Sequence, residues 1–206
     1  MKKIITLFAL SILLMAFQCE DEPSVYENYE FNKIKVNITP KSSFKKSDTI
    51  WIEGIVSSNV YDKIIQDSIF YEIGFSPAIS LYKLVKPENN ATNSKDAVDK
   101  FEIIYDTNKI SFLGRCENST FFPETELSDN EKNYKYKLGL KQLLKGDYII
   151  NFWNDSKILN TKFNDYILND YRLINLDTKI GFNSCGSTSY KSFENENTRE
   201  YFFTVE

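Results

Sequence analysis

The chain has 206 residues, of which 42% are hydrophobic and 15% aromatic, and 25 basic against 29 acidic residues give a net charge of −4. This apolar content is enough to bury a sizeable core, which excludes a largely disordered chain. The acidic balance argues against a nucleic-acid partner, because phosphates are neutralised by clustered Lys and Arg. The chain contains no histidine, so Ser-His-Asp and Cys-His catalysis and the usual zinc sites are unavailable.

The N-terminus has the two parts of an export signal. Lys2 and Lys3 form a short basic head, and residues 4–17 are an uncharged apolar run. The run of 14 residues is short for a membrane span, which needs about 20 residues. We therefore expect a signal peptide over residues 1–18, whose removal takes the net charge from −4 to −6.

The segment that follows the apolar run begins with a cysteine and turns acidic. Residues 19–28 are polar and contain a proline, which is typical of a flexible tether. A cysteine directly after the apolar run, here Cys19, resembles the signal of bacterial lipoproteins. The loose triplet Ala16-Phe17-Gln18 and the acidic Glu20-Asp21-Glu22 resemble lipoproteins of the Bacteroidetes group, over residues 1 to about 24. The resemblance implies that Cys19 is acylated, with a palmitate-type chain in the lipid bilayer, and that the protein is anchored in the outer membrane, facing the cell exterior.

Beyond the tether, we expect residues 29–206 to form one all-β domain, an Ig-like antiparallel sandwich. Short runs alternate apolar and polar residues at the period of two that marks half-buried strands, with turn signals between them. The predicted strands cover residues 32–39, 48–56, 68–75, 79–85, 100–105, 109–114, 134–140, 147–153, 179–182 and 199–205. The polar stretch over residues 86–99 predicts an exposed loop between neighbouring strands.

Residues 138–152 resemble the tyrosine corner of Greek-key sandwiches. A strand that ends near Leu140 is followed by a turn with Leu144 and Gly146, and Tyr148 opens the next strand. In such a corner, the phenol donates a hydrogen bond to the main chain across the turn. Strand alternation then points Tyr148, Ile150 and Phe152 inward and Ile149, Asn151 and Trp153 outward.

One segment departs from the β pattern. Residues 163–173 repeat apolar side chains at helical spacing, which predicts a short amphipathic helix. Such a helix could cover a sheet edge and protect it from pairing with other chains. The alternative is an appendage that carries binding residues.

The cysteines fit an exported protein. If Cys19 carries lipid, Cys116 and Cys185 remain as an even pair in an oxidising compartment, which favours a disulfide between them. The alternative is two separate buried thiols. There is no Cys-x-x-Cys and no histidine, so no metal site is predicted.

Three surface patterns bear on ligands and modification. Trp51 and Trp153 are both expected to point outward, and they could form a stacking platform for sugar rings or be covered by an edge element. Thr49 and Ser68 lie in Asp-Ser/Thr-aliphatic tripeptides that resemble the O-glycosylation acceptor of exported Bacteroidetes proteins. The acidic residues within 124–131 could hold calcium or simply form a solvated turn, because the spacing of a calcium loop is missing.

No motif identifies an activity. The glycines form neither a dinucleotide-binding nor a phosphate-binding loop, so no cofactor is expected. The sequence favours a non-catalytic binding or accessory module for a glycan, a peptide or an envelope protein. The alternatives are a carboxylate-dependent glycoside hydrolase, whose two acids need no fixed sequence spacing, and a purely structural envelope protein. Nothing in the sequence indicates an oligomeric state.

Overall fold

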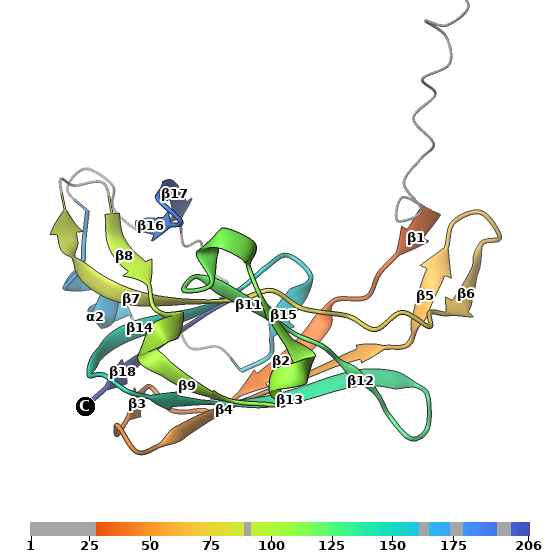
Figure 1. Ribbon diagram of the computed structural model, residues 1–206. Helices are drawn as coiled ribbons and strands as arrows, with labels where there is room; N and C mark the ends of the chain where they lie inside the picture. The colour runs from red at the N-terminus through yellow and green to blue at the C-terminus, as the bar shows by residue number, and fades with distance from the viewer. Residues whose placement is uncertain (1–27, 89–91, 161–164, 174–178, 193–198) are drawn as a thin grey trace, which may run out of the picture. The chain divides into compact units, whose positions relative to one another are not determined.

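The computed structural model describes residues 28–88, 92–160, 165–173, 179–192 and 199–206 (Figure 1). The chain divides into two compact units, the first over residues 1–31 and 60–69 and the second over 32–59 and 70–206. The signal peptide predicted for residues 1–18 and all but the last residue of the predicted tether lie outside the described residues. That residues 29–206 form one domain stays a prediction.

The first unit is built around a three-stranded sheet with the strand order β1-β5-β6. The strands are β1 (Tyr29–Glu30), β5 (Asn59–Asp62) and β6 (Asp67–Phe70). β1 runs antiparallel to β5, with Tyr29 opposite Asp62. The strand predicted over 68–75 therefore ends at Phe70, and β5 was not predicted.

The second unit contains two larger sheets, named here the small sheet and the large sheet. Among the described residues, the small sheet has the order β12-β13-β4-β2-β15, with β9 also paired to β13. Its strands are β12 (Glu126–Leu127), β13 (Asn133–Gln142), β4 (Thr49–Ser57), β2 (Ile34–Ile38), β15 (Ser156–Ile158) and β9 (Phe101–Ile104). Buried and exposed residues alternate strictly along β2, as the sequence predicts.

The large sheet has the order β17-β16-β8-β7-β14-β18-β3 in the described part of the chain, and β11 pairs with both β7 and β10. Its strands are β17 (Ser187–Ser192), β16 (Lys179–Ser184), β8 (Thr92–Asp96), β7 (Ile79–Glu88), β14 (Gly146–Phe152), β18 (Glu200–Val205), β3 (Ser43–Phe44), β10 (Ile110–Phe112) and β11 (Thr120–Pro123). Three short 3-10 helices, η2 (Val98–Lys100), η3 (Thr107–Lys109) and η4 (Gly114–Cys116), lie between these strands.

The small and large sheets share one hydrophobic core. It combines inward side chains of both sheets, among them Ile52 and Leu138 from the small sheet and Leu81, Ile150 and Phe203 from the large sheet. The fold is thus mostly β, and strands predicted from alternation are confirmed at β2, β4, β7, β9, β10, β13, β14, β16 and β18.

Both sheets are mixed, so the predicted purely antiparallel arrangement is wrong. β15 runs parallel to β2, β16 to β8 and β18 to β3, whereas pairs such as β2–β4, β4–β13 and β7–β14 are antiparallel. The physical reason is that the chain crosses between sheets before these strands pair, and only a hairpin imposes the antiparallel direction. β3 illustrates this, because it lies in the large sheet whereas β2 and β4 on either side of it in the chain lie in the small sheet.

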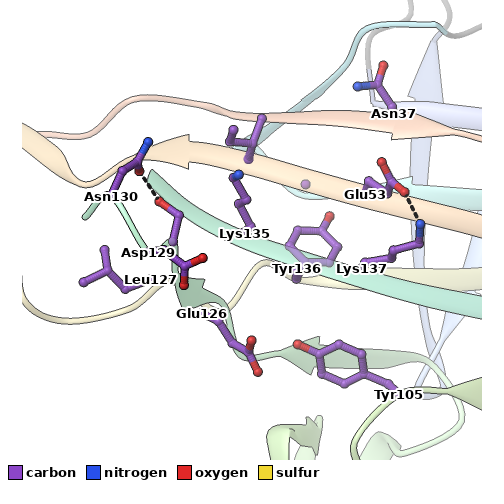
Figure 2. Close-up of a pocket in the computed structure, with 13 residues that line it drawn as sticks. Asn37, Glu53, Tyr105, Glu126, Leu127, Asp129, Asn130, Lys135, Tyr136 and Lys137 are labelled. Carbon is purple, nitrogen blue, oxygen red and sulfur yellow. Dashed lines mark hydrogen bonds and ion pairs between the residues drawn. The ribbon is translucent and has the colours of Figure 1, made fainter. Parts of the chain in front are cut away.

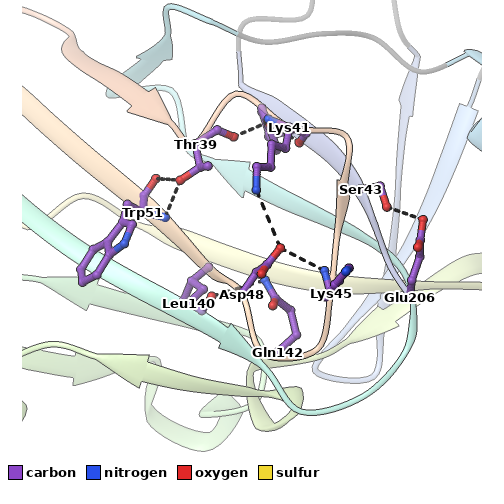
Figure 3. Close-up of polar contacts among 10 residues, drawn as sticks. Thr39, Lys41, Ser43, Lys45, Asp48, Trp51, Leu140, Gln142 and Glu206 are labelled. Carbon is purple, nitrogen blue, oxygen red and sulfur yellow. Dashed lines mark hydrogen bonds and ion pairs between the residues drawn. The ribbon is translucent and has the colours of Figure 1, made fainter.

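Polar contacts hold the crossing segment around β3 (Figure 3). The main-chain N–H of Trp51 donates to the Thr39 hydroxyl at 2.9 Å, and the N–H of Lys45 donates to the Asp48 carboxylate at 3.1 Å. At the far end, the Ser43 hydroxyl donates to the Glu206 carboxylate at 2.6 Å. The first two contacts satisfy main-chain N–H groups that no regular ladder reaches, and the third joins β3 to the C-terminal residue through side chains.

The exposed loop predicted for residues 86–99 is wrong, because β7 continues to Glu88 and β8 follows at Thr92. The polar side chains of Asn93 and Ser94 on β8 are buried and bonded to distant parts of the chain. The Asn93 amide donates to the main-chain oxygen of Tyr171 at 2.8 Å and accepts from the N–H of Gly181 at 3.0 Å, and the Ser94 hydroxyl donates to the Gly181 oxygen at 3.2 Å. Polar composition indicates a loop only where such partners are lacking.

The predicted short helix is present as α2 (Asp165–Asn169), and residues 163–164 lie outside the described residues. Ile167 packs in a second cluster on the outer face of the large sheet with Tyr82, Leu84, Ile149, Ile180, Phe182 and Phe202. The helix therefore covers a sheet face rather than the sheet edge that the sequence analysis favoured. No helix in the described ranges is long and apolar enough to cross a membrane.

Candidate functional site

The tyrosine corner is confirmed in its central contact. The Tyr148 hydroxyl donates to the main-chain oxygen of Leu144 at 2.9 Å. The Tyr148 ring is fully buried and packs between Phe101 and Phe203, at centroid distances of 5.0 and 5.6 Å. Burial, followed by the negative charges of Asp99 and Asp147, raises the pKa of Tyr148 to about 12. The corner thus fixes the start of β14, and this determines which side chains of β14 point to the outer face of the large sheet.

The predicted disulfide is also confirmed. Cys116 ends η4 and Cys185 lies in the turn between β16 and β17, with 5.6 Å between the two Cα atoms. The N–H of Cys185 donates to the Asp96 carboxylate at 3.0 Å, and the hydroxyls of Ser119 and Ser184 lie 2.5 Å apart. These contacts tie the β16–β17 hairpin to the rest of the large sheet.

The two tryptophans point outward on different sheets, so they do not share one platform. Trp51 lies on β4 of the small sheet, is 41% exposed, and has the Lys137 ammonium 5.4 Å from its ring centroid. Trp153 directly follows β14 of the large sheet, is 48% exposed, and meets Phe122 edge-on at 6.2 Å. Each ring is therefore accessible to solvent and is not covered by an edge element among the described residues.

Trp153 lines a hollow of about 560 Å³ on the outer face of the large sheet, named here the aromatic hollow. Its rim carries the exposed rings of Trp153 and Tyr190, and the nearly buried rings of Tyr82 and Phe182 lie deeper, 4.6 Å apart. Five polar residues and one further ring complete the lining, namely Asn151, Asn154, Asp155, Ser189, Arg199 and Phe152. The hollow therefore combines flat apolar faces with amide, carboxylate and guanidinium groups.

Two of the polar side chains are held by neighbours. The Arg199 guanidinium donates to the side-chain oxygen of Asn154. The Asp155 carboxylate accepts from the Ser156 hydroxyl at 2.9 Å. Desolvation raises the pKa of Asp155, and hydrogen bonds from Ser156 and from main-chain groups oppose that rise. Donors and acceptors at this rim are thus pre-positioned, which lowers the ordering cost of binding.

The second unit has a larger but different hollow of about 840 Å³ on the outer face of the small sheet, named here the polar hollow (Figure 2). Across β4 and β13, the Lys137 ammonium and the Glu53 carboxylate form an ion pair at 2.6 Å. Lys109 pairs with Glu126, one of the acidic residues of the 124–131 cluster. These groups are exposed, so the pairs contribute little to stability, and each already satisfies its own charges.

The share of aromatic rings in the lining favours the aromatic hollow over the polar hollow as a ligand site. Ligand pockets are lined mainly by apolar and aromatic groups with a few polar groups that fix orientation. Five of the ten residues that line the aromatic hollow are aromatic, whereas the polar hollow has two aromatic residues, Tyr105 and Tyr136, among its thirteen. Within the described ranges, no group of three or more His, Cys, Asp or Glu side chains could hold a metal ion.

Part of the site could be predicted from sequence and part could not. Asn151 and Trp153 point outward as the alternation along β14 predicts. Tyr190 and Arg199 were missed, because β17 has no alternating apolar pattern and Arg199 precedes β18 in a polar stretch. A tyrosine in an otherwise polar run is the signal that could have identified β17 as a binding edge.

The O-glycosylation and acylation sites remain predictions. Ser68 is exposed on β6, whereas Thr49 is half-buried at the start of β4, so Ser68 meets the accessibility that O-glycosylation requires and Thr49 meets it in part. Cys19 lies outside the described residues. The chain matches no protein-family model, no curated protein and no solved structure.

Proposed function

We propose that the chain is an outer-membrane lipoprotein, anchored through acylated Cys19 and facing the cell exterior, whose second unit is a non-catalytic binding module for a glycan. The observation that carries the glycan proposal is the aromatic hollow, where Trp153 and Tyr190 stand beside amide, carboxylate and guanidinium groups. We further propose that the second unit has an Ig-like arrangement, which the Tyr148 corner supports.

The chemistry of a sugar ring matches this lining. A pyranose has an apolar C–H face that stacks on an aromatic ring, and a perimeter of hydroxyls that both donate and accept hydrogen bonds. Asn151 and Asn154 each offer a donor and an acceptor, Arg199 offers donors, and Asp155 offers acceptors. Trp153 and Tyr190, about half exposed, would gain burial against a ligand, worth about 25 cal/mol for each Å² of apolar area.

The anchor proposal rests on the sequence around Cys19 and agrees with the disulfide. The basic head, the apolar run and the cysteine that follows it form the pattern of a lipoprotein signal. The Cys116–Cys185 disulfide fits export, because disulfides persist in oxidising compartments. The acidic Glu20-Asp21-Glu22 supports the assignment to the outer surface.

Affinity electrophoresis tests the glycan proposal. The protein is run through native gels that contain one soluble polysaccharide each, with a non-binding protein as the mobility standard. We expect retarded migration with at least one polysaccharide and no release of new reducing ends on incubation. Release of reducing ends would support the glycoside hydrolase instead, and unretarded migration with every polysaccharide would contradict glycan binding.

Metabolic labelling with a fatty-acid analogue tests the anchor. Cys19→Ala should lose the label and leave the membrane fraction, while an intact Cys116–Cys185 disulfide shows that the chain still folds. Replacing Glu20, Asp21 and Glu22 with alanine should keep the label but lose accessibility to external protease. A wild-type protein that is soluble in the periplasm with a free Cys19 would contradict the anchor.

A further inference from the structure

Two isoleucines are exposed at the tip of the β5–β6 hairpin in the first unit. Ile64 is 70% exposed and Ile65 is 59% exposed, so most of both aliphatic side chains is in contact with solvent. Aliphatic side chains gain stability when they leave water for an apolar environment, so both would favour a partner that covers them. Two consecutive residues of this kind at one turn form an apolar tip.

The turn that presents them is fixed by its own hydrogen bonds. The main-chain N–H groups of Ile64 and Ile65 both donate to the carboxylate of Asp62, at 2.8 and 3.4 Å. Gln66 closes the turn with a φ of 56°, in the left-handed region. Because the Asp62 carboxylate accepts from both N–H groups, the turn is ordered and both isoleucine side chains project into solvent from it.

The tip lies beside the point where the chain arrives from the proposed anchor. The N–H of Lys63 donates to the main-chain oxygen of Asn28 at 2.9 Å, and β1 begins at the next residue (Figure 1). Asn28 is nine residues after Cys19. Nine residues reach at most about 30 Å even when fully extended. The apolar tip is therefore held within that reach of an acylated cysteine.

We propose that the β5–β6 turn is a second membrane contact, in which Ile64 and Ile65 insert into the interfacial region of the lipid bilayer that holds the Cys19 anchor. This inference rests on the proposed acylation of Cys19. The bilayer is the apolar phase that the anchor places next to this turn, at a high effective concentration. A lipid chain already supplies the main affinity, so two isoleucines suffice to fix how the first unit meets the surface.

A site-specific probe on the full-length lipidated protein tests the contact. Ile65→Cys introduces a thiol that can be labelled selectively, because Cys116 and Cys185 form a disulfide and Cys19 carries lipid in this proposal. The thiol is labelled with nitrobenzoxadiazole, and the protein is reconstituted into phosphatidylethanolamine–phosphatidylglycerol vesicles that contain doxyl-labelled lipid. The matched control is Ser68→Cys, an exposed position on β6 of the same unit.

The inference predicts a blue-shifted emission and at least threefold stronger quenching at position 65 than at position 68. Equal quenching at the two positions in protein that carries the fatty-acid label would overturn the membrane contact and leave the anchor intact. A blue shift at position 65 without quenching would show that protein covers the tip, and would also overturn the inference. Absence of the fatty-acid label would overturn the anchor and, with it, this inference.

Discussion

The outer faces of the two sheets of the second unit differ in what covers them. On the small sheet, the outer side chains of β4 and β13 are exposed or half-buried, and charged residues such as Glu53 and Lys137 pair directly across the strands. On the large sheet, the outer side chains Ile149 and Phe202 are buried beneath a second cluster that includes Ile167 of α2. The aromatic hollow lies on this same outer face.

This difference bears on where a binding site can form. A sheet face that is wholly solvated offers charges that already have partners, whereas a face that is packed at one end can leave aromatic rings accessible at the other. Tyr82 and Phe182 belong to both the second cluster and the aromatic hollow, so the packed part of the face supports the open part. The stability of the second cluster and the shape of the hollow should therefore be coupled.

Truncating a buried ring on the outer face of the large sheet should have the largest effect. Phe202 is 1% exposed, so Phe202→Ala should lower the free energy of unfolding by about 3–5 kcal/mol. The matched change on the small sheet, Lys137→Ala, removes one exposed ion pair and should cost less than about 1 kcal/mol. Urea unfolding measures both. Similar losses of unfolding free energy in the two variants would contradict the difference between the outer faces of the two sheets.

The disulfide should contribute nearly as much. It closes a loop with a sequence separation of 69 residues, which corresponds to about 4 kcal/mol on the chain-entropy account. Cys116→Ser should lower the melting temperature by the same amount as the double variant with Cys185→Ser, because either change opens the same loop. Additive effects of the two single changes would argue against a shared bond.

Loss of the hydroxyl should change the free energy of unfolding differently for two buried tyrosines, one on each sheet. Tyr148 on β14 donates to Leu144, so Tyr148→Phe should cost about 1–3 kcal/mol. Tyr136 on β13 is 4% exposed, and its hydroxyl has no hydrogen-bond partner among the described residues. Tyr136→Phe should therefore be neutral or stabilising. Equal losses in equilibrium unfolding would remove the distinction.

Alkaline pH should weaken the corner by a smaller amount. The pKa of Tyr148 is raised to about 12, whereas an unfolded tyrosine ionises near 10. The contribution of Tyr148 to stability is therefore complete below pH 10 and is lost as the pH rises towards 12, by about 2 kcal/mol. Unfolding free energies measured from pH 8 to 12 should fall less steeply for Tyr148→Phe than for wild type. Parallel curves would contradict this linkage.

The sequence predicts those parts of the fold whose determinants lie close together in the chain. Alternation identifies β2, β4 and β13 because one face of each is solvated, and the corner is readable because Leu144 and Tyr148 are four residues apart. β8 was missed because its buried side chains depend on a distant strand, as the bond between Asn93 and Gly181 shows. Gly54 shows the same limit, because a Cβ there would lie 1.9 Å from the Tyr136 ring, which only the strand register reveals.

The site was predictable only in part for a related reason. Trp51 and Trp153 were both correctly expected to point outward, but sequence patterns do not say which sheet a strand joins, so their separation was not foreseen. Tyr190 and Trp153 both line the aromatic hollow because β17 and β14 belong to one sheet, with β16, β8 and β7 between them.

Because Trp51 and Trp153 lie on different sheets, a comparison of the two provides the most direct test of glycan binding in the aromatic hollow. Isothermal titration with an oligosaccharide from the retarding polysaccharide should give saturable binding to wild type and to Trp51→Ala, and at least tenfold weaker binding to Trp153→Ala. The two tryptophans have similar exposure, 41% and 48%, so the pair controls for the loss of a surface ring. Unchanged affinity for Trp153→Ala, or an equal loss in both variants, would contradict the assignment of the binding site to the aromatic hollow.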